Sequence, residues 1–387
     1  MTEPLAPTRA DRVLVLAPHP DDETLATGGL LQRAQAAGAE VRVLFVTDGE
    51  NNPWAQRATE HRWRITGADR ERWGERRRGE ALAALGCLGV SPWQTAFLGY
   101  PDQGIHGLLL SGDEDLAETL NGEIGRFRPT LLVAPSLEDL HPDHSALAVY
   151  VRLALARLDA AQRPPRERQF IVHHVGPLAV SGRAAKLDLT REECGRKRRA
   201  ILCHASQLRL RRGALLSFAA ASELYFPAAT VGEHCAEHPV RHASVEGEAL
   251  VFELARTSRP GAFGATGLLL ALQRPGSLRT LIARLPGRTG AIELYEWSGG
   301  TLVARGEMRR AERGSPERVA LPATVLAGWV HAFAKLERRF GFFDEAGWRA
   351  LPCRNAQADV SERAAARAAA LGMRVTARAQ RAPRAPE

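Results

Sequence analysis

The sequence lacks the features that mark membrane, secreted and disulfide-bonded proteins. No stretch of its 387 residues approaches the roughly 18 to 20 consecutive apolar residues that span a bilayer. The first residues, MTEPLAPTRADR, lack the basic and then apolar layout of a secretory signal. The 5 cysteines are scattered and form no CxxC pair, which argues against a disulfide framework and against a thiolate zinc cluster. We therefore expect a cytoplasmic globular protein with reduced cysteines.

Two further absences narrow the class of protein. No glycine-rich phosphate loop follows the first apolar run, which argues against a dinucleotide- or phosphate-dependent enzyme. Aromatic and basic residues are not interleaved in the way that proteins use to stack bases. The formal net charge is +8, but the excess is spread over segments at 70–78, 209–212 and 363–384, interleaved with acids or alanines. We therefore expect no nucleic-acid partner.

The first half of the chain alternates short β-type runs with helical patterns. This alternation is typical of a parallel sheet covered by helices on both faces. The predicted strands are 12–17, 41–47, 95–98, 130–134 and 169–173, and the predicted helices are 24–37, 70–85, 114–127 and 144–158. We therefore predict the α/β class, with a Rossmann-like, mostly parallel sheet in a catalytic domain at residues 1–228.

The second half has a different pattern. Here β-type runs are joined by turn formers, which is typical of hairpins. The predicted hairpins are 268–272 with 278–285 and 291–297 with 301–304, and a helix is predicted at 323–338. These elements indicate a smaller α+β accessory domain at 229–354. The Ala- and Arg-rich segment 355–387 is predicted to be a partly disordered tail.

A histidine and three carboxylates gather directly after the first predicted strand. His19, Asp21, Asp22 and Glu23 lie within five residues, ahead of a predicted helix. A helix N-terminus offsets the repulsion of such acids by only about 0.3 to 1 kcal/mol per charge, whereas a divalent cation would offset far more. Simple helix capping by the two aspartates is the alternative.

A second cluster, His141-Pro142-Asp143-His144, follows the predicted strand at 130–134 and its loop. Ligands of open α/β sheets bind outside the carboxyl ends of the strands, so the two clusters can converge in space. A catalytic zinc site takes three ligands from His and carboxylates and leaves a position for water. The clusters supply such a set with a spare acid and a spare imidazole, which hydrolysis needs for proton transfer.

The two motifs resemble those of the PIG-L (LmbE-like) family of zinc-dependent N-acetylglucosaminyl deacetylases. The family's HPDDE segment stands here at 19–23 and its HPDH segment at 141–144, and the likeness extends over 12–227. Pro18 stands where some members have Ala, which stiffens the turn but removes no ligand. The resemblance implies a hydrolase that removes the N-acetyl or N-acyl group from an amino-sugar (N-acetylglucosamine-type) conjugate.

The resemblance also implies roles for single residues. It implies that His19, Asp22 and His144 bind one zinc ion per chain. It further implies that Asp21 acts as the general base and that His141 acts as the electrophile or acid.

Three more residues have an implied role. By the same resemblance, Asp143 would orient a histidine, and Arg77 and Asp102 would bind sugar hydroxyls. The adjacent histidines His173 and His174 follow a predicted strand, and they could either line the sugar pocket or have a structural role in the core or at the strand end. The His- and Cys-containing segment at 234–242 is interpreted as a surface loop. An alternative function for the whole chain is a binding protein whose basic C-terminal half recognises an anionic polymer.

Overall fold

The computed structural model describes most of the chain outside its ends and several loops. The described residues are 5–174, 184–228, 238–255, 263–286, 288–310, 316–340 and 342–353. The predicted tail at 355–387 and residues 234–237 of the predicted surface loop at 234–242 lie outside these residues. In the described remainder His238 is buried and a strand begins at Val240, so the prediction of a surface loop is wrong there. None of the helices in the described ranges is long and apolar enough to cross a membrane.

The N-terminal part is built on a five-stranded sheet in the order β3-β2-β1-β4-β5. Its strands are β1 (Arg12–Ala17), β2 (Glu40–Thr47), β3 (Thr95–Tyr100), β4 (Leu131–Pro135) and β5 (Arg166–Phe170). Every neighbouring pair is parallel. The central strands β1 and β4 are apolar along almost their whole length because both of their faces are buried. The predicted parallel sheet is confirmed, and β5 begins and ends earlier than the predicted strand.

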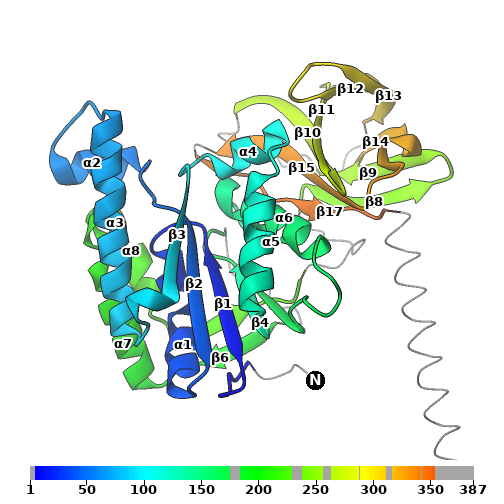
Figure 1. Cartoon of the computed structure of the whole chain (residues 1–387). Helices are drawn as coiled ribbons and strands as arrows, with labels where there is room; N and C mark the ends of the chain where they lie inside the picture. The colour runs from blue at the N-terminus through cyan, green and yellow to red at the C-terminus, as the bar shows by residue number, and fades with distance from the viewer. Residues whose placement is uncertain are drawn as a thin grey trace, which may run out of the picture.

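Helices cover both faces of this sheet (Figure 1). They are α1 (Asp22–Ala36), α2 (Pro53–Glu60), α3 (Gly67–Cys87), α4 (Ile105–Ser111), α5 (Asp115–Phe127), α6 (Pro142–Ala156), α7 (Arg191–Cys203) and α8 (Ala205–Ser217). Alternate residues of β1 point to opposite faces: Val13 and Val15 pack with α1, α3 and α7, whereas Leu14 and Leu16 pack with α4, α5 and α6. A 3₁₀ turn (Pro92–Gln94) precedes β3, and β6 (Ala185–Asp188) pairs with β7 (Ser222–Tyr225).

The strand order places a ligand crevice between β1 and β4. From β1 the chain adds β2 and β3 on one side, and it then crosses to add β4 and β5 on the other side. The carboxyl ends of strands at such a switch point form the usual ligand site of open α/β sheets. Both polar motifs follow these two strands.

The C-terminal part is a ten-stranded antiparallel sheet in the order β16-β15-β10-β11-β12-β13-β14-β9-β8, with β17 beside β15. Its strands are β8 (Val240–Glu246), β9 (Ala249–Leu254), β10 (Phe263–Arg274), β11 (Ser277–Arg284), β12 (Gly290–Glu296), β13 (Leu302–Arg309), β14 (Glu317–Pro322), β15 (His331–Phe340), β16 (Phe343–Asp344) and β17 (Arg349–Ala350). Along β10, Leu268 and Leu270 face this sheet's own core, whereas Leu269 and Ala271 join the core beneath α4 and α6. The two parts therefore share a hydrophobic core.

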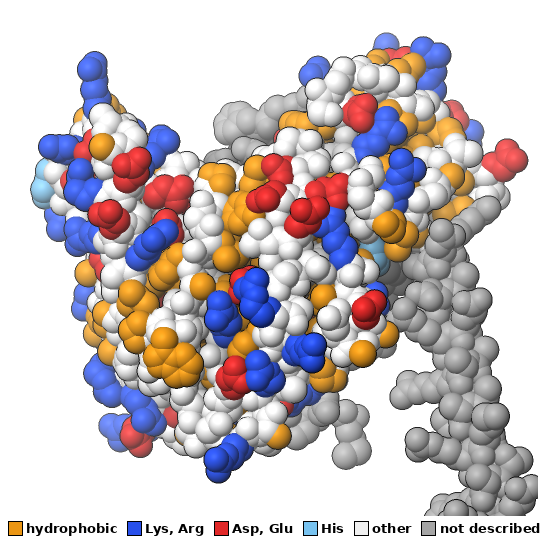
Figure 2. Space-filling view, viewed as in Figure 1, with side chains coloured by type: hydrophobic (Ala, Val, Ile, Leu, Met, Phe, Trp, Pro, Cys, Tyr) orange, Lys and Arg blue, Asp and Glu red, His pale blue; other side chains and the backbone are white. Residues whose placement is uncertain are grey.

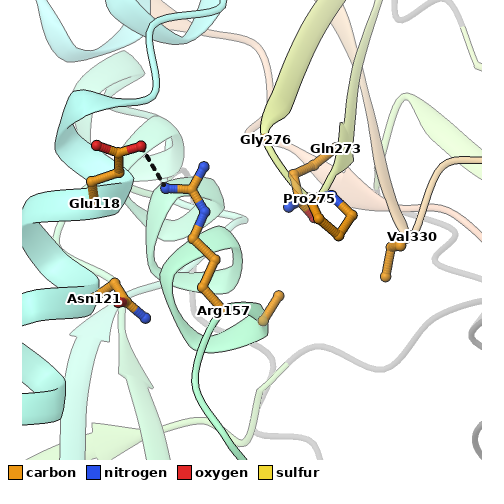
Figure 3. Close-up of a pocket in the computed structure, with 8 residues that line it drawn as sticks. Glu118, Asn121, Arg157, Gln273, Pro275, Gly276 and Val330 are labelled. Atoms are coloured by element: carbon orange, nitrogen blue, oxygen red, sulfur yellow. Dashed lines mark ion pairs between the residues drawn. The ribbon is translucent and has the colours of Figure 1, made fainter.

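Polar contacts reinforce this junction. Arg157, at the end of α6, pairs with Glu114 and Glu118, and Glu114 accepts the backbone N–H of Leu278 at 2.9 Å. Arg157 and Glu118 line a cavity of about 490 Å³ between α5, α6 and the β10–β11 turn (Figure 3). The two charges at this cavity pair with each other, and Glu114, which also pairs with Arg157, links the helices to the second sheet.

The predicted helix at 323–338 is wrong. The chain forms a 3₁₀ turn (Ala323–Leu326) and then strand β15. Both faces of β15 are covered, because Ala334 faces the core of its own sheet while Phe333 faces the core beneath α6. A strand that is buried on both faces shows no polar and apolar alternation, so periodicity does not separate it from a buried helix.

Candidate active site

The first motif forms a tight turn at the carboxyl end of β1. Thr47, at the end of β2, donates from its backbone N–H (3.1 Å) and from its hydroxyl (2.9 Å) to the carbonyl oxygen of Pro18. The backbone N–H of His19 donates to Asp22 Oδ2 at 3.0 Å. These bonds fix the turn so that the imidazole of His19 and the carboxylate of Asp22 face each other at the start of α1.

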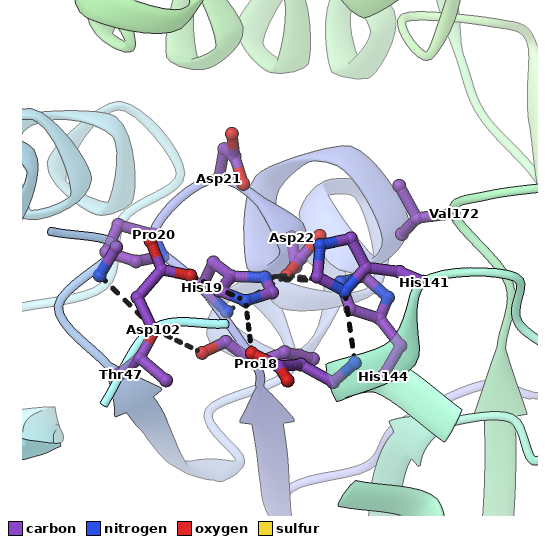
Figure 4. A network of polar contacts seen from close by, with 12 residues as sticks. Pro18, His19, Pro20, Asp21, Asp22, Thr47, Asp102, His141, His144 and Val172 are labelled. Atoms are coloured by element: carbon purple, nitrogen blue, oxygen red, sulfur yellow. Dashed lines mark hydrogen bonds and ion pairs between the residues drawn. The ribbon is translucent and has the colours of Figure 1, made fainter. Parts of the chain in front are cut away.

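Three donor atoms from the two motifs form a nearly equilateral triangle (Figure 4). His19 Nδ1 and His144 Nε2 each lie 3.2 Å from Asp22 Oδ2, and the two nitrogens lie 3.3 Å apart. All three side chains are buried. A tetrahedral zinc ion with bonds of about 2.0 to 2.1 Å separates its ligands by about 3.3 Å. The donor set and its spacing therefore fit a metal ion.

Two more histidines extend this set. His141 groups with His19 and His144, and His173 groups with Asp22 and His144, with candidate donor atoms within 4.8 Å of one another in each group. His173 follows β5, and the sequence leaves its role open. Its position beside the triangle places it in the lining of the site.

A buried carboxylate that the sequence analysis missed orients His144. Asp139 Oδ2 lies 3.1 Å from His144 Nδ1 and accepts the backbone N–H groups of Val172 (2.8 Å) and His173 (3.2 Å). Asp139 Oδ1 accepts the N–H of His141 at 2.9 Å. Burial alone would lower the pKa of His144, but the carboxylates of Asp22 and Asp139 outweigh it and raise this pKa to about 9. Such a partner fixes a ligand's tautomer and raises its basicity.

Carboxylates also hold the outer nitrogen of His19. His19 Nε2 lies 3.2 Å from Asp102 Oδ1 and 3.5 Å from Asp143 Oδ2. Burial opposes a charge on His19, but the carboxylates of Asp102, Asp143 and Asp22 prevail and hold its pKa well above the usual value. Asp143 thus contacts a histidine, and its orienting role stays a prediction. Asp102 is buried against a histidine, and its contact with a sugar stays a prediction.

Asp21 lies beside the triangle and is held apart from it. It precedes α1 with φ 135°, which is a strained conformation for a residue other than glycine. Its side chain accepts no capping hydrogen bond from the described backbone of α1, so Asp21 does not cap this helix as the alternative interpretation requires. Instead, Asp21 Oδ2 accepts from Arg77 at 3.2 Å. Burial raises the pKa of Asp21 to about 6, against the opposing charge of Arg77.

Arg77 is part of the support for this strained residue. Its guanidinium is buried and donates to the carbonyl of Gly49 at 2.9 Å and to the carbonyl of Pro20. These bonds tie α3 to the loop after β2 and to the turn that precedes Asp21. Arg77 also lines the cavity described below, and its predicted contact with sugar hydroxyls stays a prediction.

His141 caps α6 through its side chain. Its Nδ1 accepts the backbone N–H of Asp143 at 3.2 Å, so the proton of the neutral ring lies on Nε2. Burial and the neighbouring charges of His144 and His19 hold the pKa of His141 well below its usual value. A neutral imidazole with a fixed Nε2–H is suited to donate a hydrogen bond to a developing oxyanion.

A cavity of about 350 Å³ opens onto these groups. Many segments line it: the β1 turn with the start of α1, the start of α2, Arg77 of α3, the loop after β3, the segments after β4 and β5, α8, and residues 342–343 of the second sheet. The reactive side chains on its surface are His19, Asp21, Asp22, His141 and His173. The site thus combines a metal-binding donor set, a carboxylate of raised pKa and room for an organic substrate.

The comparisons with known proteins agree with this site. Residues 14–155 match the family model described as GlcNAc-PI de-N-acetylase, PIG-L. A 1D-myo-inositol 2-acetamido-2-deoxy-alpha-D-glucopyranoside deacetylase of Gordonia bronchialis is 35% identical over 175 residues, 39% of this chain and 59% of that protein. The protein of the same description in Mycolicibacterium gilvum is 35% identical over 169 residues, 39% of this chain and 55% of that protein. The chain therefore spans less than two thirds of these relatives.

Solved structures align with somewhat more than half of the chain. The antimicrobial reagent A40926 pseudoaglycone deacetylase Dbv21 is 24% identical with a TM-score of 0.44, and the alignment covers 57% of this chain and 99% of that chain. The conserved protein TT1542 from Thermus thermophilus is 27% identical with a TM-score of 0.42, covering 57% of this chain and 96% of that chain. The match of the family model includes both motifs of the donor set. The chain therefore carries a PIG-L family domain at residues 14–155.

Proposed function

We propose that the protein is a zinc-dependent hydrolase that removes the N-acetyl or N-acyl group from an amino-sugar conjugate. The observation that carries this proposal is the triangle of donor atoms from His19, Asp22 and His144 beside a carboxylate of raised pKa. The description of the relatives as acetamido-sugar deacetylases supports the substrate class. On this proposal residues 1–228 form the catalytic domain and residues 229–354 an accessory domain.

His19, Asp22 and His144 would hold the zinc ion, and Asp139, Asp102 and Asp143 would orient the two imidazoles. A bound zinc ion supplies Lewis-acid chemistry, since it acidifies water and polarises a carbonyl group. The carboxylates around the histidines favour this binding because they offset the charge of a divalent cation in a buried site.

Asp21 accepts a proton from the attacking water. Its pKa of about 6 leaves the carboxylate ionised at neutral pH and close to the range in which a general base is most efficient. Arg77 and the strained backbone hold it at the cavity wall. His141 donates a hydrogen bond from Nε2–H to the amide oxygen as that oxygen gains negative charge. The proton that Asp21 has taken passes to the amide nitrogen as the C–N bond breaks, which releases the sugar amine and a carboxylate.

The alternative of a polyanion-binding protein has less support. On the face shown in Figure 2, Lys and Arg side chains lie interspersed with Asp and Glu side chains. Many of the described arginines also form ion pairs; in the second sheet Arg305 pairs with Glu293 and Arg318 pairs with Glu246. Paired charges contribute little to the attraction of an anionic polymer.

The division of roles is tested by Asp21→Asn and Asp22→Asn, with Asp48→Asn as the control. Asp48 follows β2 at the neighbouring strand end and pairs with Arg78, so its variant is expected to keep both zinc and activity. Asp21→Asn is expected to bind zinc but to lose about 10²- to 10⁴-fold in amine release, the usual contribution of a general base. Asp22→Asn is expected to lose zinc. Equal loss of zinc in both variants would refute this division.

A further inference from the structure

Two phenylalanines of the second sheet reach the catalytic groups. Phe342 lies between β15 and β16 and Phe343 begins β16, and both are beyond the residues that match the family model. The ring centroids of Phe342 and His141 lie 4.8 Å apart, and those of Phe343 and His173 lie 5.1 Å apart. Both phenylalanines line the cavity of the site. The accessory sheet therefore supplies part of the cavity wall.

Specific contacts hold this turn in place. The N–H of Asp344 donates to the carbonyl of Leu140 at 3.0 Å, and the N–H of Trp348 donates to the carbonyl of Leu137 at 2.7 Å. Lys335 of β15 forms a buried ion pair with Asp344. The turn is thus fixed against the loop that precedes the second motif, so the positions of its rings are tied to the catalytic groups.

Apolar side chains continue around the mouth of the cavity. Among the described residues, eight large hydrophobic side chains are exposed. Three of these, Trp54 of α2, Leu210 of α8 and Phe342, line this one cavity, with exposures of 64%, 53% and 41%. Leu215 and Phe218, at the end of α8, add to the same lining. Exposed apolar groups that gather at a concave site are typical of ligand binding.

A sugar ring alone does not account for this lining. Its hydroxyl groups need polar partners. The cavity offers these through His19, Asp21 and His141, and through Asn52, Gln103, Gln207 and Arg211, whereas the three exposed apolar side chains are left for an apolar group. We infer that Phe342, Trp54 and Leu210 form a subsite for an apolar group that the substrate carries beside its amino sugar. This inference rests on the proposed function and narrows its substrate class to amphiphilic conjugates. Two sources share the required chemistry: a long N-acyl chain and an apolar aglycone.

Paired substrates test the subsite and separate the two sources. We compare amine release from the methyl and octyl glycosides of N-acetylglucosamine, and from N-acetyl- and N-octanoylglucosamine. In one of these pairs the octyl or octanoyl compound is expected to have a kcat/KM about tenfold or more above that of its methyl or acetyl partner, mainly through a lower KM. The reason is that each buried methylene raises affinity by about fourfold. The pair that shows the effect identifies the source. Equal kcat/KM within both pairs would overturn the inference.

Variants link the preference to the aromatic turn. Phe342→Ala is expected to reduce the preference for the octyl compound by about tenfold, whereas Phe342→Leu is expected to keep most of it. Trp297→Ala is the matched control, because Trp297 is 38% exposed in the β12–β13 turn and does not line this cavity. Thermal unfolding confirms that each variant is folded. A Phe342→Ala enzyme that keeps the full preference would also refute the inference.

A binding measurement separates failure of the subsite from failure of the proposed function. Octyl glucosaminide, methyl glucosaminide and N-octanoylglucosamine are titrated by calorimetry into the full chain as purified. Tighter binding of an octyl-bearing compound than of methyl glucosaminide, weakened by Phe342→Ala, would support the subsite even if no amine were released. Amine release from all substrates without selective binding would refute the subsite and leave the proposed function intact.

Discussion

The substitution Asp139→Asn removes the charge that orients His144 and keeps the shape of the side chain. Asp139 Oδ2 receives three donors, from His144, Val172 and His173, and Oδ1 receives the N–H of His141. If the amide oxygen of Asn takes the place of Oδ2, its NH₂ group faces the N–H of His141, so one bond is lost. His144, a proposed zinc ligand, also loses the carboxylate that raises its pKa. Loss of such a partner costs about 10- to 100-fold in metal affinity.

The pH dependence of this loss follows from the pKa of His144. In the native chain a pKa of about 9 makes protons compete with the metal at neutral pH. The substitution lowers this pKa, which weakens the competition and offsets part of the loss. The deficit in zinc affinity is therefore expected to widen as the pH rises from about 7 toward 9. The assay is competition for zinc with a chromophoric chelator at several pH values.

The control for this experiment is Glu138→Gln, an exposed carboxylate one residue earlier in the same loop. It is expected to leave zinc affinity unchanged. Thermal unfolding of the zinc-free proteins checks that Asp139→Asn is folded. Zinc affinity within twofold of the native value at every pH would refute the orienting role of Asp139.

Three further predictions concern stability. His238 is buried, and burial is the chief cause that lowers its pKa to about 4, so unfolding returns this pKa to 6.5. The contribution of the neutral imidazole to the free energy of unfolding is therefore fully present above about pH 6.5 and is lost as the pH falls toward 4. The advantage of the native chain over His238→Gln in free energy of unfolding should thus shrink by about 2 kcal/mol between about pH 7.5 and 5, measured by denaturant titration. In Gly347→Ala the new Cβ would lie 1.8 Å from the carbonyl oxygen of Leu137. We therefore expect the free energy of unfolding to fall by about 1 to 3 kcal/mol and zinc binding to weaken. Unchanged stability would contradict this contact. Lys197→Met leaves the carboxylate of Glu223 buried without the ammonium group that lies 2.6 Å from it. We expect the free energy of unfolding, measured by thermal or denaturant unfolding, to fall by about 3 kcal/mol. An unchanged free energy of unfolding would mean that the backbone donors to Glu223 suffice.

The convergence of the two motifs was predictable because it depends on strand order and on local pattern. The runs that became β1 and β4 are apolar along almost their whole length, and parallel strands bring their carboxyl ends to one edge. His19 and His144 therefore meet although they are far apart in the sequence. The residue types of the motifs then indicate a metal site.

The partners of these two histidines were less predictable. Asp139 is an ordinary loop acid in the sequence, and only the fold brings its carboxylate to His144; its place two residues before His141 was the available signal. Asp102 was predicted to contact sugar, and its burial against His19 depends on the register of β3 beside β2. The wrong helix at 323–338 has the same origin, since a strand covered on both faces by distant segments carries no local signature.

The central claim is that the two motifs meet around one zinc ion that the hydrolysis needs. Zinc content and amine release from an N-acetylglucosamine conjugate, measured on the native chain beside His144→Ala, test it most directly. The control is His61→Asn, an exposed histidine whose left-handed backbone (φ 53°) suits asparagine. The account predicts about one zinc per native or control chain, none in His144→Ala, and amine release that a chelator abolishes and zinc restores. Chelator-resistant amine release, or equal zinc content in His144→Ala, would contradict it.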